Sequence, residues 1–322
     1  MKLAGNRLLV PGGAGFVGSA LVRAALRHGL RPVAFDALTY AADPRNIEGV
    51  CELVHADVCD ADAVARAVER ADAVINVAAE THVDRAIGAV GDNGAHPFLA
   101  TNVVGTQNLI DACRRRGVPL VAVSTDEVYG PLPDGIDASE DAPLRPRNAY
   151  AASKAAADML ALAACATFGV NAVVTRSVNN YGPRQHPEKL IPRLITRAIR
   201  GRRLPIFGDG RHSRGWIHVD DHAEALIHVL HNGEAGTVYN ISAGVERHNL
   251  QVAREVLSVL GRPADLVEHV ADRAGHDRRY GIANARLTAL GWTPRAVSFE
   301  LGLADTVRWY EENETWWTAK AS

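Results

Sequence analysis

The chain of 322 residues is long enough for one large domain or two smaller ones, and its 47% of hydrophobic residues supports a sizeable core. A formal net charge of -2, without a basic block, argues against electrostatic binding of nucleic acid. The four cysteines form no CxxC pair, so we expect reduced thiols and neither a disulfide framework nor a metal site. The first residues contain no apolar signal segment and no run is expected to be long enough to cross a bilayer, which predicts a cytoplasmic protein without a membrane partner.

The chain begins with the pattern of a strand, a glycine-rich turn and a helix. Apolar residues 7–11 are followed by Gly12, Gly15 and Gly18, and an amphipathic segment, 19–28, comes next. Glycines at this spacing let the backbone approach a pyrophosphate at a helix N-terminus, where free N–H groups and the helix dipole favour anions. The pattern predicts a dinucleotide site, with a purely structural turn as the alternative.

The second predicted strand, 32–36, supports this interpretation because it ends in an acid. Asp36 lies eighteen residues beyond Gly18, close to the position of the ribose-binding acid in such units. A carboxylate here would hydrogen-bond to the ribose 2′-OH and repel a 2′-phosphate, which favours NAD over NADP. The alternative is an ordinary loop acid.

Two further strands, 52–55 and 73–77, continue the alternation of strands and helices. The first leads to Asp57-Val58, where the edge of an adenine could be bound. The second leads to Ala78-Ala79, whose small side chains would let a cofactor pass closely.

Two helices are predicted around these strands. Asp60 can cap a helix that includes residues 64–68. A second helix begins at Thr101-Asn102 and ends near Gly117.

The strand 121–125 runs into the triple Thr125-Asp126-Glu127, and the pair Tyr150 and Lys154 opens an alanine-rich helix. Carboxylates are unfavourable at the end of a buried strand unless a ligand or a partner meets them. The i, i+4 spacing places Tyr150 and Lys154 on one helix face, where the ammonium would lower the pKa of the phenol. These groups form an acid/base centre if the triple faces them, whereas a Tyr and Lys alone at this spacing are more often a solvated face.

A sixth strand, 172–176, completes the pattern of an α/β protein with a doubly wound parallel (Rossmann) sheet. Ligands of such sheets bind at the carboxyl ends of the strands, where the glycine turn, Asp36, Ala78-Ala79 and Thr125 all fall.

The second half of the chain has a different texture, with a turn-rich stretch at 179–183 and short mixed elements to about residue 309. We expect a smaller C-terminal lobe, interleaved with the first, that supplies side chains to close a cleft. Lys189, Arg214 and Arg273 are candidates for binding a second diphosphate, although surface cations are the commoner role for any one of them.

Several longer stretches are similar to one family, and the likeness extends from about residue 7 to about residue 310. The stretches are Leu38–Tyr40, Ala79–Arg85, Ser124–Gly130, Tyr150–Lys154, Asn179–Pro192, Phe207–Gly210 and Gly275–Tyr280. The chain resembles the extended short-chain dehydrogenases/reductases and, within them, the dTDP-glucose 4,6-dehydratase family, which is set apart by the Thr-Asp-Glu triple.

The resemblance implies an internal redox dehydration with NAD as a bound prosthetic group. Tyr150 would take the proton of the sugar 4-OH while hydride moves from C4 to NAD, and Thr125 would hold that hydroxyl. Glu127 would then take the C5 proton, Asp126 would protonate the departing 6-OH, and hydride would return to C6. Lys154 would also bind the nicotinamide ribose.

The resemblance also implies the remaining site residues and the domain division. Predicted cofactor residues are Gly12, Gly15, Phe16, Val17, Gly18, Asp36, Asp57, Val58, Ala78, Ala79, Tyr150 and Lys154. Predicted substrate residues are Asn180, Glu188, Lys189, Leu190, Arg214, Asn249, Arg273 and His276, with His82 and Asp84 near the sugar or in a structural role. The NAD-binding domain would comprise 1–176 and about 212–243, and the nucleotide-sugar-binding lobe 177–211 and 244–322.

Some positions depart from the family pattern: Pro11, a longer stretch at 86–100, Ser177-Val178, Arg184 and Gly215. Apart from Pro11, which lies in the glycine turn, they surround the substrate and not the acid/base residues. They leave the nucleobase and the sugar open, but not the reaction type.

The same residues leave two alternative functions open and favour one oligomeric state. A 4-epimerase or decarboxylase of this fold would need Tyr150 and Lys154 but not the acid pair. A non-catalytic NAD-binding sensor would have no need to keep all five reactive groups. Alanine-rich helices at 102–112 and 155–166 favour a homodimer through a four-helix interface.

Overall fold

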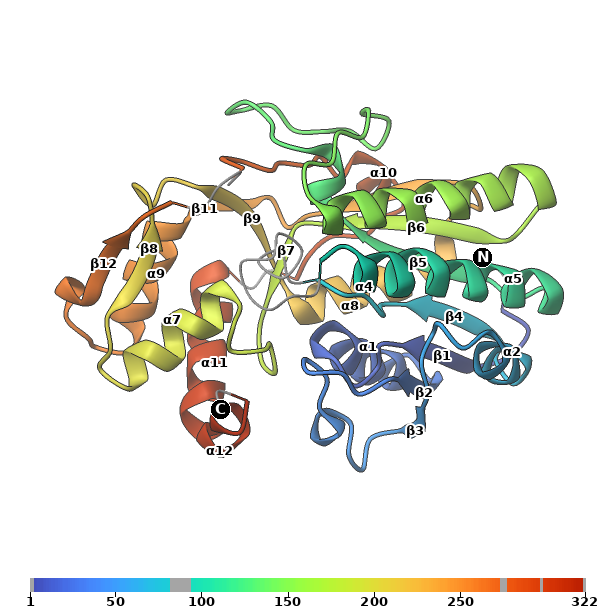
Figure 1. The fold of residues 1–322 in the computed structure, drawn as a ribbon, viewed down its shortest axis with the longest axis horizontal. Coiled ribbons are helices and arrows are strands. Elements are labelled where there is room, and N and C mark those ends of the chain that lie inside the picture. Colours follow the sequence, from blue (N-terminus) through green and yellow to red (C-terminus); the bar gives the residue numbers. More distant parts are fainter. Residues whose placement is uncertain (1–2, 82–93, 273–276, 296–297, 321–322) are drawn as a thin grey trace.

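A parallel sheet of seven strands organises the larger lobe (Figure 1), in the order β10-β6-β5-β4-β1-β2-β3. In this computed structural model, residues 3–81, 94–272, 277–295 and 298–320 are described. Its strands are β1 (Arg7–Pro11), β2 (Arg31–Asp36), β3 (Glu52–His55), β4 (Ala73–Asn76), β5 (Leu120–Thr125), β6 (Ala172–Ser177) and β10 (Val238–Ile241). The strand order reverses between β1 and β4, which is the topological switch point of a doubly wound sheet, so the predicted fold class is confirmed.

Helices cover both faces of this sheet because successive strand residues point to opposite sides. Along β1, Leu8 and Val10 belong to one apolar core and Leu9 belongs to the other. The first core is closed by α1 (Phe16–Arg27) and α8 (Val219–Asn232). The second is closed mainly by the three helices of the opposite face, α2 (Ala61–Glu69), α5 (Thr106–Arg116) and α6 (Ala149–Phe168).

Local capping explains where several of these helices begin and end. The Asp60 carboxylate accepts hydrogen bonds from the N–H groups of Asp62 and Ala63, which confirms the predicted cap of α2. Gly117 ends α5 in the left-handed conformation, with φ of 71°. Helix α1 begins at Phe16, three residues earlier than expected, because the glycine turn leads directly into it.

Helix α6 corrects the expectation that no run could cross a bilayer. Its 20 residues are long and apolar enough by length and composition. Nevertheless it packs against β5 and β6 and buries polar groups, including Lys154 and Asp158, so it is a core helix of this fold.

The helix expected to start at Thr101-Asn102 begins earlier. Helix α4 (His96–Phe98) continues through a π-helical stretch, η2 (Leu99–Gly105), into α5. Pro97 lies in the first turn, where its missing N–H is not needed. The expected start was therefore wrong, because Asn102 lies buried inside a helical stretch that begins at His96.

The smaller lobe has its own core and two small sheets, β11-β9-β7 and β12-β8. Its elements are β7 (Asn179–Tyr181), α7 (Leu190–Ile199), β8 (Leu204–Phe207), β9 (Ser213–His218), β11 (Val245–His248), α9 (Asn249–Val259), β12 (Val267–Val270), α11 (Phe299–Glu312) and α12 (Glu314–Thr318). Shorter helical pieces, which belong to both lobes, are η1 (Pro44–Asn46), η3 (Asp126–Tyr129), η4 (Ala264–Leu266) and α10 (Ala285–Ala289).

The two lobes interleave, although not at the predicted residue. The stretch 212–243 was assigned to the larger domain, and its α8 and β10 do lie there. Its first strand, β9, pairs instead with β7 and β11 in the smaller lobe. The chain therefore crosses between the sheets after His218 and not at residue 212.

Candidate active site

The acid pair sits in a tight turn at the carboxyl end of β5. The Thr125 hydroxyl accepts a hydrogen bond from the Glu127 N–H at 3.3 Å and donates one to Asp126 Oδ1 at 3.2 Å. Gly130, with φ of 75°, then turns the chain away. The single residue Thr125 thus caps the turn and orients both acids.

The two carboxyl groups differ in burial and in hydrogen bonding. Asp126 is 1% exposed, and its Oδ2 has no hydrogen-bond partner among the described residues. Burial, and next the charge of Glu127, raise the pKa of Asp126 to about 7. Burial also raises the pKa of Glu127, opposed first by its hydrogen bond with Asn148 and then by the charge of Arg214. Near neutral pH, Asp126 can therefore keep a proton beside Glu127.

Asn148 connects this pair to the helix that carries Tyr150. As the N-cap of α6, it accepts a hydrogen bond from the Ala151 N–H at 2.8 Å through Oδ1. Its Nδ2 donates to Glu127 Oε2 at 3.3 Å. One side chain therefore fixes the start of α6 and the direction of Glu127, which brings the predicted acid/base groups together.

Tyr150 and Lys154 are both buried on the inner face of α6, as their spacing requires. The Tyr150 ring lies edge-on to Phe98, with centroids 6.5 Å apart. Lys154 Nζ donates to the Val123 carbonyl at 2.5 Å, next to the end of β5. Burial lowers the pKa of Lys154 to about 8, and the charge of Asp158 opposes this.

The expectation that Lys154 lowers the pKa of Tyr150 is wrong for this structure. Burial raises the pKa of Tyr150, and the charges of Glu127 and Asp126 raise it further. A hydrogen bond with Thr125 acts in the opposite direction. Desolvation outweighs the neighbouring cation here, because burial is the largest influence on the pKa of the phenol.

Two supporting residues were missed in the sequence. Asp158, one turn beyond Lys154, forms a buried ion pair with Arg176, with Oδ2 and Nε 2.9 Å apart. Asn102 accepts the Glu80 N–H and donates to the Ser153 hydroxyl, each at 2.9 Å. An acid in the middle of an alanine-rich apolar helix was the available signal for Asp158, whereas nothing local marked Asn102.

The glycine turn has the shape that a dinucleotide requires. Gly15 is the N-cap of α1 and, within the described chain, no side chain caps it, so the first N–H groups of α1 are open to an anion. Gly12 has φ of 80°, and a Cβ there would lie 2.6 Å from the Ala78 nitrogen. Asp36 accepts the Ala14 N–H at 2.9 Å and has its pKa raised by burial. The residues present therefore fit NAD.

A hollow of about 210 Å³ lies along this turn. Ten of the predicted cofactor residues line it: Gly12, Gly15, Phe16, Val17, Gly18, Asp36, Asp57, Val58, Ala78 and Ala79. Others that the sequence did not single out also line it, among them Thr39, Ala42, Thr101, Gln185 and His186. Lys189 of the smaller lobe borders the same space, so both lobes contribute to the cleft.

The predicted substrate residues that the structure describes come from four elements or their ends in the smaller lobe. Arg214 on β9 is buried, donates to the carbonyls of Ser213 and Asp277 at 2.7 and 2.9 Å, and stacks on the Tyr280 ring. Its charge lowers the pKa values of both Asp126 and Glu127, so the guanidinium acts on the acid pair.

The other described substrate residues also lie in the smaller lobe. Asn180 on β7 is oriented by His222, whose Nδ1 lies 2.8 Å from Asn180 Oδ1. Glu188 accepts the Tyr40 hydroxyl at 3.0 Å, and Lys189 acts on the pKa of Glu127. Leu190 begins α7 and Asn249 begins α9. His82, Asp84, Arg273 and His276 lie outside the described residues.

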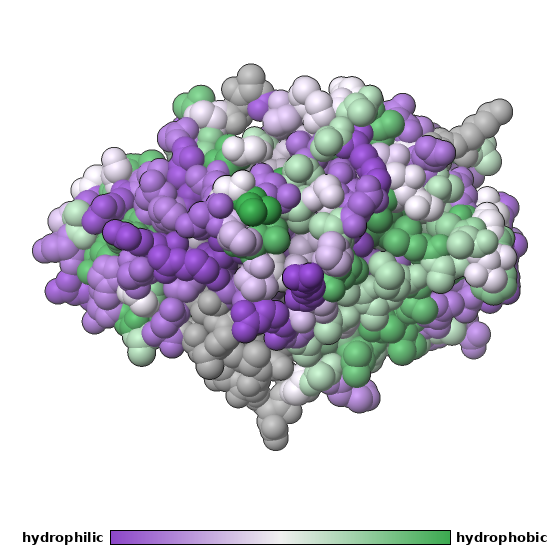
Figure 2. All heavy atoms as spheres, turned by 90° about the horizontal axis from the view of Figure 1, so that it is seen from above, coloured by the Kyte–Doolittle hydropathy of each residue, from purple (hydrophilic) through white to green (hydrophobic). Residues whose placement is uncertain are grey.

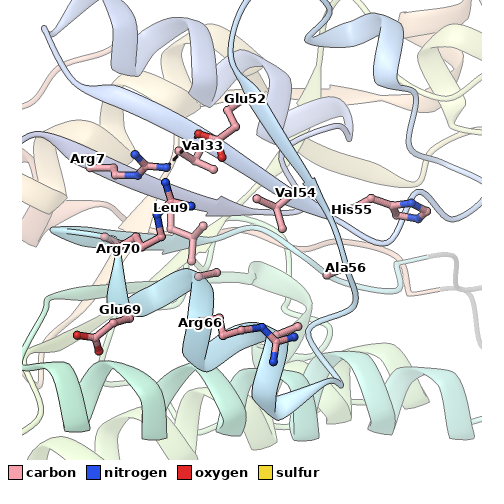
Figure 3. Close-up of a pocket in the computed structure, with 13 residues that line it drawn as sticks. Arg7, Leu9, Val33, Glu52, Val54, His55, Ala56, Arg66, Glu69 and Arg70 are labelled. Atoms are coloured by element: carbon pink, nitrogen blue, oxygen red, sulfur yellow. Dashed lines mark hydrogen bonds and ion pairs between the residues drawn. The ribbon is translucent and has the colours of Figure 1, made fainter.

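A larger hollow, of about 630 Å³, lies elsewhere, beside β1, β2, β3 and α2 (Figure 3). Its apolar floor includes Leu9 and Val54, and its rim carries Arg7, Arg66 and Arg70. Arg7 is paired with Glu52 at 3.0 Å. None of the predicted site residues lines this hollow, whereas ten of the predicted cofactor residues line the hollow along the glycine turn.

Fold and site together define a nicotinamide-dependent enzyme of the Rossmann type, with a Tyr/Lys pair and an acid pair at the sheet edge. The family model described as the NAD dependent epimerase/dehydratase family matches residues 8–242. The chain belongs to this family.

Individual relatives extend the match to the full length. A dTDP-glucose 4,6-dehydratase of Streptomyces niveus is 45% identical over 97% of this chain and 94% of its own. The crystal structure of DesIV, a dTDP-glucose 4,6-dehydratase from Streptomyces venezuelae with NAD bound, is 44% identical, with a TM-score of 0.92 over 98% of this chain and 99% of that chain. A UDP-glucose 4-epimerase from Thermus thermophilus, also with NAD, is 31% identical, with a TM-score of 0.87 over 95% and 99%.

Proposed function

We propose that the chain is a dTDP-glucose 4,6-dehydratase, an NAD-dependent hydro-lyase that converts dTDP-glucose to dTDP-4-keto-6-deoxyglucose. The observation that carries the proposal is the acid pair near Tyr150, in which Asp126 is buried and Glu127 is joined to the helix of Tyr150 through Asn148. Full-length relatives with this activity support the substrate. The cofactor is NAD.

The first step removes hydrogen from C4 of the sugar. When bound, NAD would supply the hydride acceptor for C4 and the hydride donor for C6, and its positive nicotinamide would oppose the raised pKa of Tyr150. Tyr150 takes the 4-OH proton, and Thr125 holds that hydroxyl. Lys154, fixed by the Val123 carbonyl, supplies a positive charge behind the phenol.

The second step eliminates water across C5 and C6. The 4-ketone acidifies the C5 proton, which Glu127 takes as a general base. Asp126 gives its proton to the 6-OH, which leaves as water. The pKa of about 7 at Asp126 suits an acid, because a large share of the group is protonated near neutral pH.

The smaller lobe would hold the nucleoside diphosphate. Arg214 and Lys189 are its cations that act on Glu127, and Asn180, Glu188, Leu190 and Asn249 lie in the same lobe. Arg273 and His276 belong to the same proposal, and His82 and Asp84 would lie near the sugar. Under this assignment the larger lobe would be the NAD-binding domain and the smaller lobe would bind the nucleotide sugar.

Product analysis separates this reaction from the 4-epimerase alternative. After incubation with dTDP-glucose, we expect a product lighter by one water, and deuterium placed at C4 should appear in the new C6 methyl group. An epimerase would leave the mass unchanged and keep the label at C4. A sensor would return dTDP-glucose, UDP-glucose and related sugars unaltered. A panel of nucleotide glucoses, with NMR of the product, fixes the nucleobase.

The assembly we propose is a cytoplasmic homodimer. Exposed apolar side chains gather on the face of η2, α5 and α6, including Leu99, Val104, Met159 and Phe168. Figure 2 shows a broad apolar area over the half of the molecule that carries α5 and α6. Covering it with a second copy would remove this surface from water. Sedimentation should give a dimer at micromolar concentration, and a monomer would contradict the proposal.

A further inference from the structure

Helix α12 of the smaller lobe is attached to the loop that follows β2 in the larger lobe. The indole Nε1 of Trp316 donates to Asn46 Oδ1 at 3.1 Å. Arg45 Nη2 donates to the Trp316 carbonyl at 3.4 Å. Trp316 and Asn46 are 7% and 1% exposed, so this is a packed joint and not a surface contact.

A second attachment comes from Lys320, just beyond α12. Its Nζ lies 3.3 Å from Asp43 Oδ2, and both side chains are less than a tenth exposed. The same Nζ donates to the Ala42 carbonyl at 3.2 Å. Ala42 itself lines the cofactor cleft. Asp43 also pairs with Arg45 at 2.7 Å, so Lys320 adds a second cation that ties the end of the chain to this loop.

Asn46 and Asp43, the residues that Trp316 and Lys320 contact, are also hydrogen-bonded to the glycine turn. Asn46 Nδ2 donates to the Ala14 carbonyl at 2.9 Å, and the Asp43 N–H donates to the same oxygen at 3.1 Å. The Ala14 N–H donates to Asp36 Oδ2 at 2.9 Å. The N–H of Ala14 is therefore held by Asp36. The carbonyl of Ala14 is held by Asn46 and Asp43, which lie in the loop that α12 contacts.

The position of Ala14 links these contacts to the binding of the cofactor. Ala14 lies between Gly12 and Gly15, in the turn that precedes the open N–H groups of α1. Turns of this kind bind an anion only while their N–H groups point in one direction. Glycines do not fix that direction by themselves, since their backbone is the least restricted of all.

We propose that Trp316, Asn46 and Lys320 are positioning residues for the cofactor, and that α12 is a strap from the smaller lobe that keeps the glycine turn in its NAD-binding shape. The strap explains why the last helix of the smaller lobe crosses to the larger one. It also makes NAD retention depend on the closure of the two lobes. Since the readout is NAD binding without any sugar, failure of the dehydratase assignment would not affect its test.

Adjacent tryptophans provide a matched pair of variants. W316F keeps the aromatic ring and removes the hydrogen bond to Asn46. W317F removes an equivalent bond, from Trp317 Nε1 to the Tyr310 carbonyl at 2.8 Å, which stays inside the smaller lobe. Stopped-flow measurement of NAD dissociation should show a rate increase of roughly two- to tenfold for W316F, the effect of one hydrogen bond, and no change for W317F.

Lys320→Met provides an independent variant that leaves the tryptophans intact. It should also accelerate NAD dissociation, and it decides the question if W316F does not fold. Thermal unfolding of each variant with and without NAD separates loss of stability from loss of the cofactor. The proposal is overturned if W316F and W317F change NAD dissociation equally, or if neither W316F nor Lys320→Met changes it.

Discussion

The two lobes build their parts of the site in different ways. In the larger lobe, the cofactor residues lie at the ends of neighbouring parallel strands, so each is positioned by a few residues of local sequence. In the smaller lobe, Asn180, Lys189, Arg214 and Asn249 come from separate elements and meet only through tertiary packing. The larger lobe also holds the buried acids, whereas the smaller lobe presents the cations. Under the proposed function, the larger lobe would carry the chemistry and the smaller lobe would bind the substrate.

The strongest test of this division is Glu127→Gln on the chemical side. Loss of the base should lower the rate of dehydration roughly 10²- to 10⁴-fold, while oxidation at C4 continues. Because the charge of Glu127 raises the pKa of Tyr150, its removal should also shift the C4 oxidation profile to lower pH. Rapid-quench product analysis and NADH absorbance measure the two steps separately.

A matched control for that variant is Glu140→Gln. Glu140 is a buried acid of the same lobe, and its carboxylate accepts hydrogen bonds from the backbone N–H groups of Asn240 and Arg286. The side-chain amide oxygen of a glutamine at this position can still accept both. Dehydration should stay within a few-fold of the unaltered chain. Equal losses in Glu127→Gln and Glu140→Gln would mean that the effect is structural.

On the binding side, Arg214→Gln should weaken substrate binding. Loss of hydrogen bonds to a charged phosphate is expected to raise KM roughly 10- to 100-fold, with a smaller change in kcat. Arg247→Gln, which affects a more exposed ion pair with Glu300 in the same lobe, is the control and should leave KM unchanged. A change in kcat with KM unaltered would mean that Arg214 acts in the chemical steps and not in substrate binding.

The glycine turn can be tested by comparing two glycines with similar backbones. Gly12 and Gly29 have φ of 80° and 72°, so alanine should cost about 1–2 kcal/mol of stability at either position. Only Gly12 is crowded, by the Ala78 nitrogen 2.6 Å from the added Cβ. Gly12→Ala should therefore also lose NAD affinity, as measured by calorimetry, whereas Gly29→Ala should retain it.

The smallest effect concerns the acid Asp126. Its pKa of about 7 means that the proton needed for the 6-OH is present below that pH and is lost above it. Single-turnover elimination should fall as pH rises through about 7, up to roughly tenfold per pH unit. Asp126→Asn cannot lose a proton in this range and should give a slow, flat profile. If the elimination rate of Asp126→Asn still falls as pH rises through about 7, a group other than Asp126 causes the fall.

Sequence patterns located most of the larger lobe because its signals are local. The glycine spacing, the acid after β2 and the Thr-Asp-Glu triple each occupy a few consecutive residues, and all fall at strand ends in the structure. The predictions that failed depended on surroundings. The start of the helix near Asn102 was misplaced because the helical stretch extends back to His96, and the pKa of Tyr150 was misjudged because burial cannot be read from spacing.

By itself, the sequence determined the order of strands and helices, the turn that can bind a dinucleotide and the identity of the reactive side chains, because periodicity, glycine spacing and side-chain chemistry are properties of neighbouring residues. Only the tertiary structure decided how those groups behave. It placed Asn148 between Glu127 and α6, set Arg214 where its charge acts on the acid pair, and carried α12 across to Ala14. Desolvation and long-range hydrogen bonds depend on which distant segments pack together, and no stretch of sequence contains that information alone.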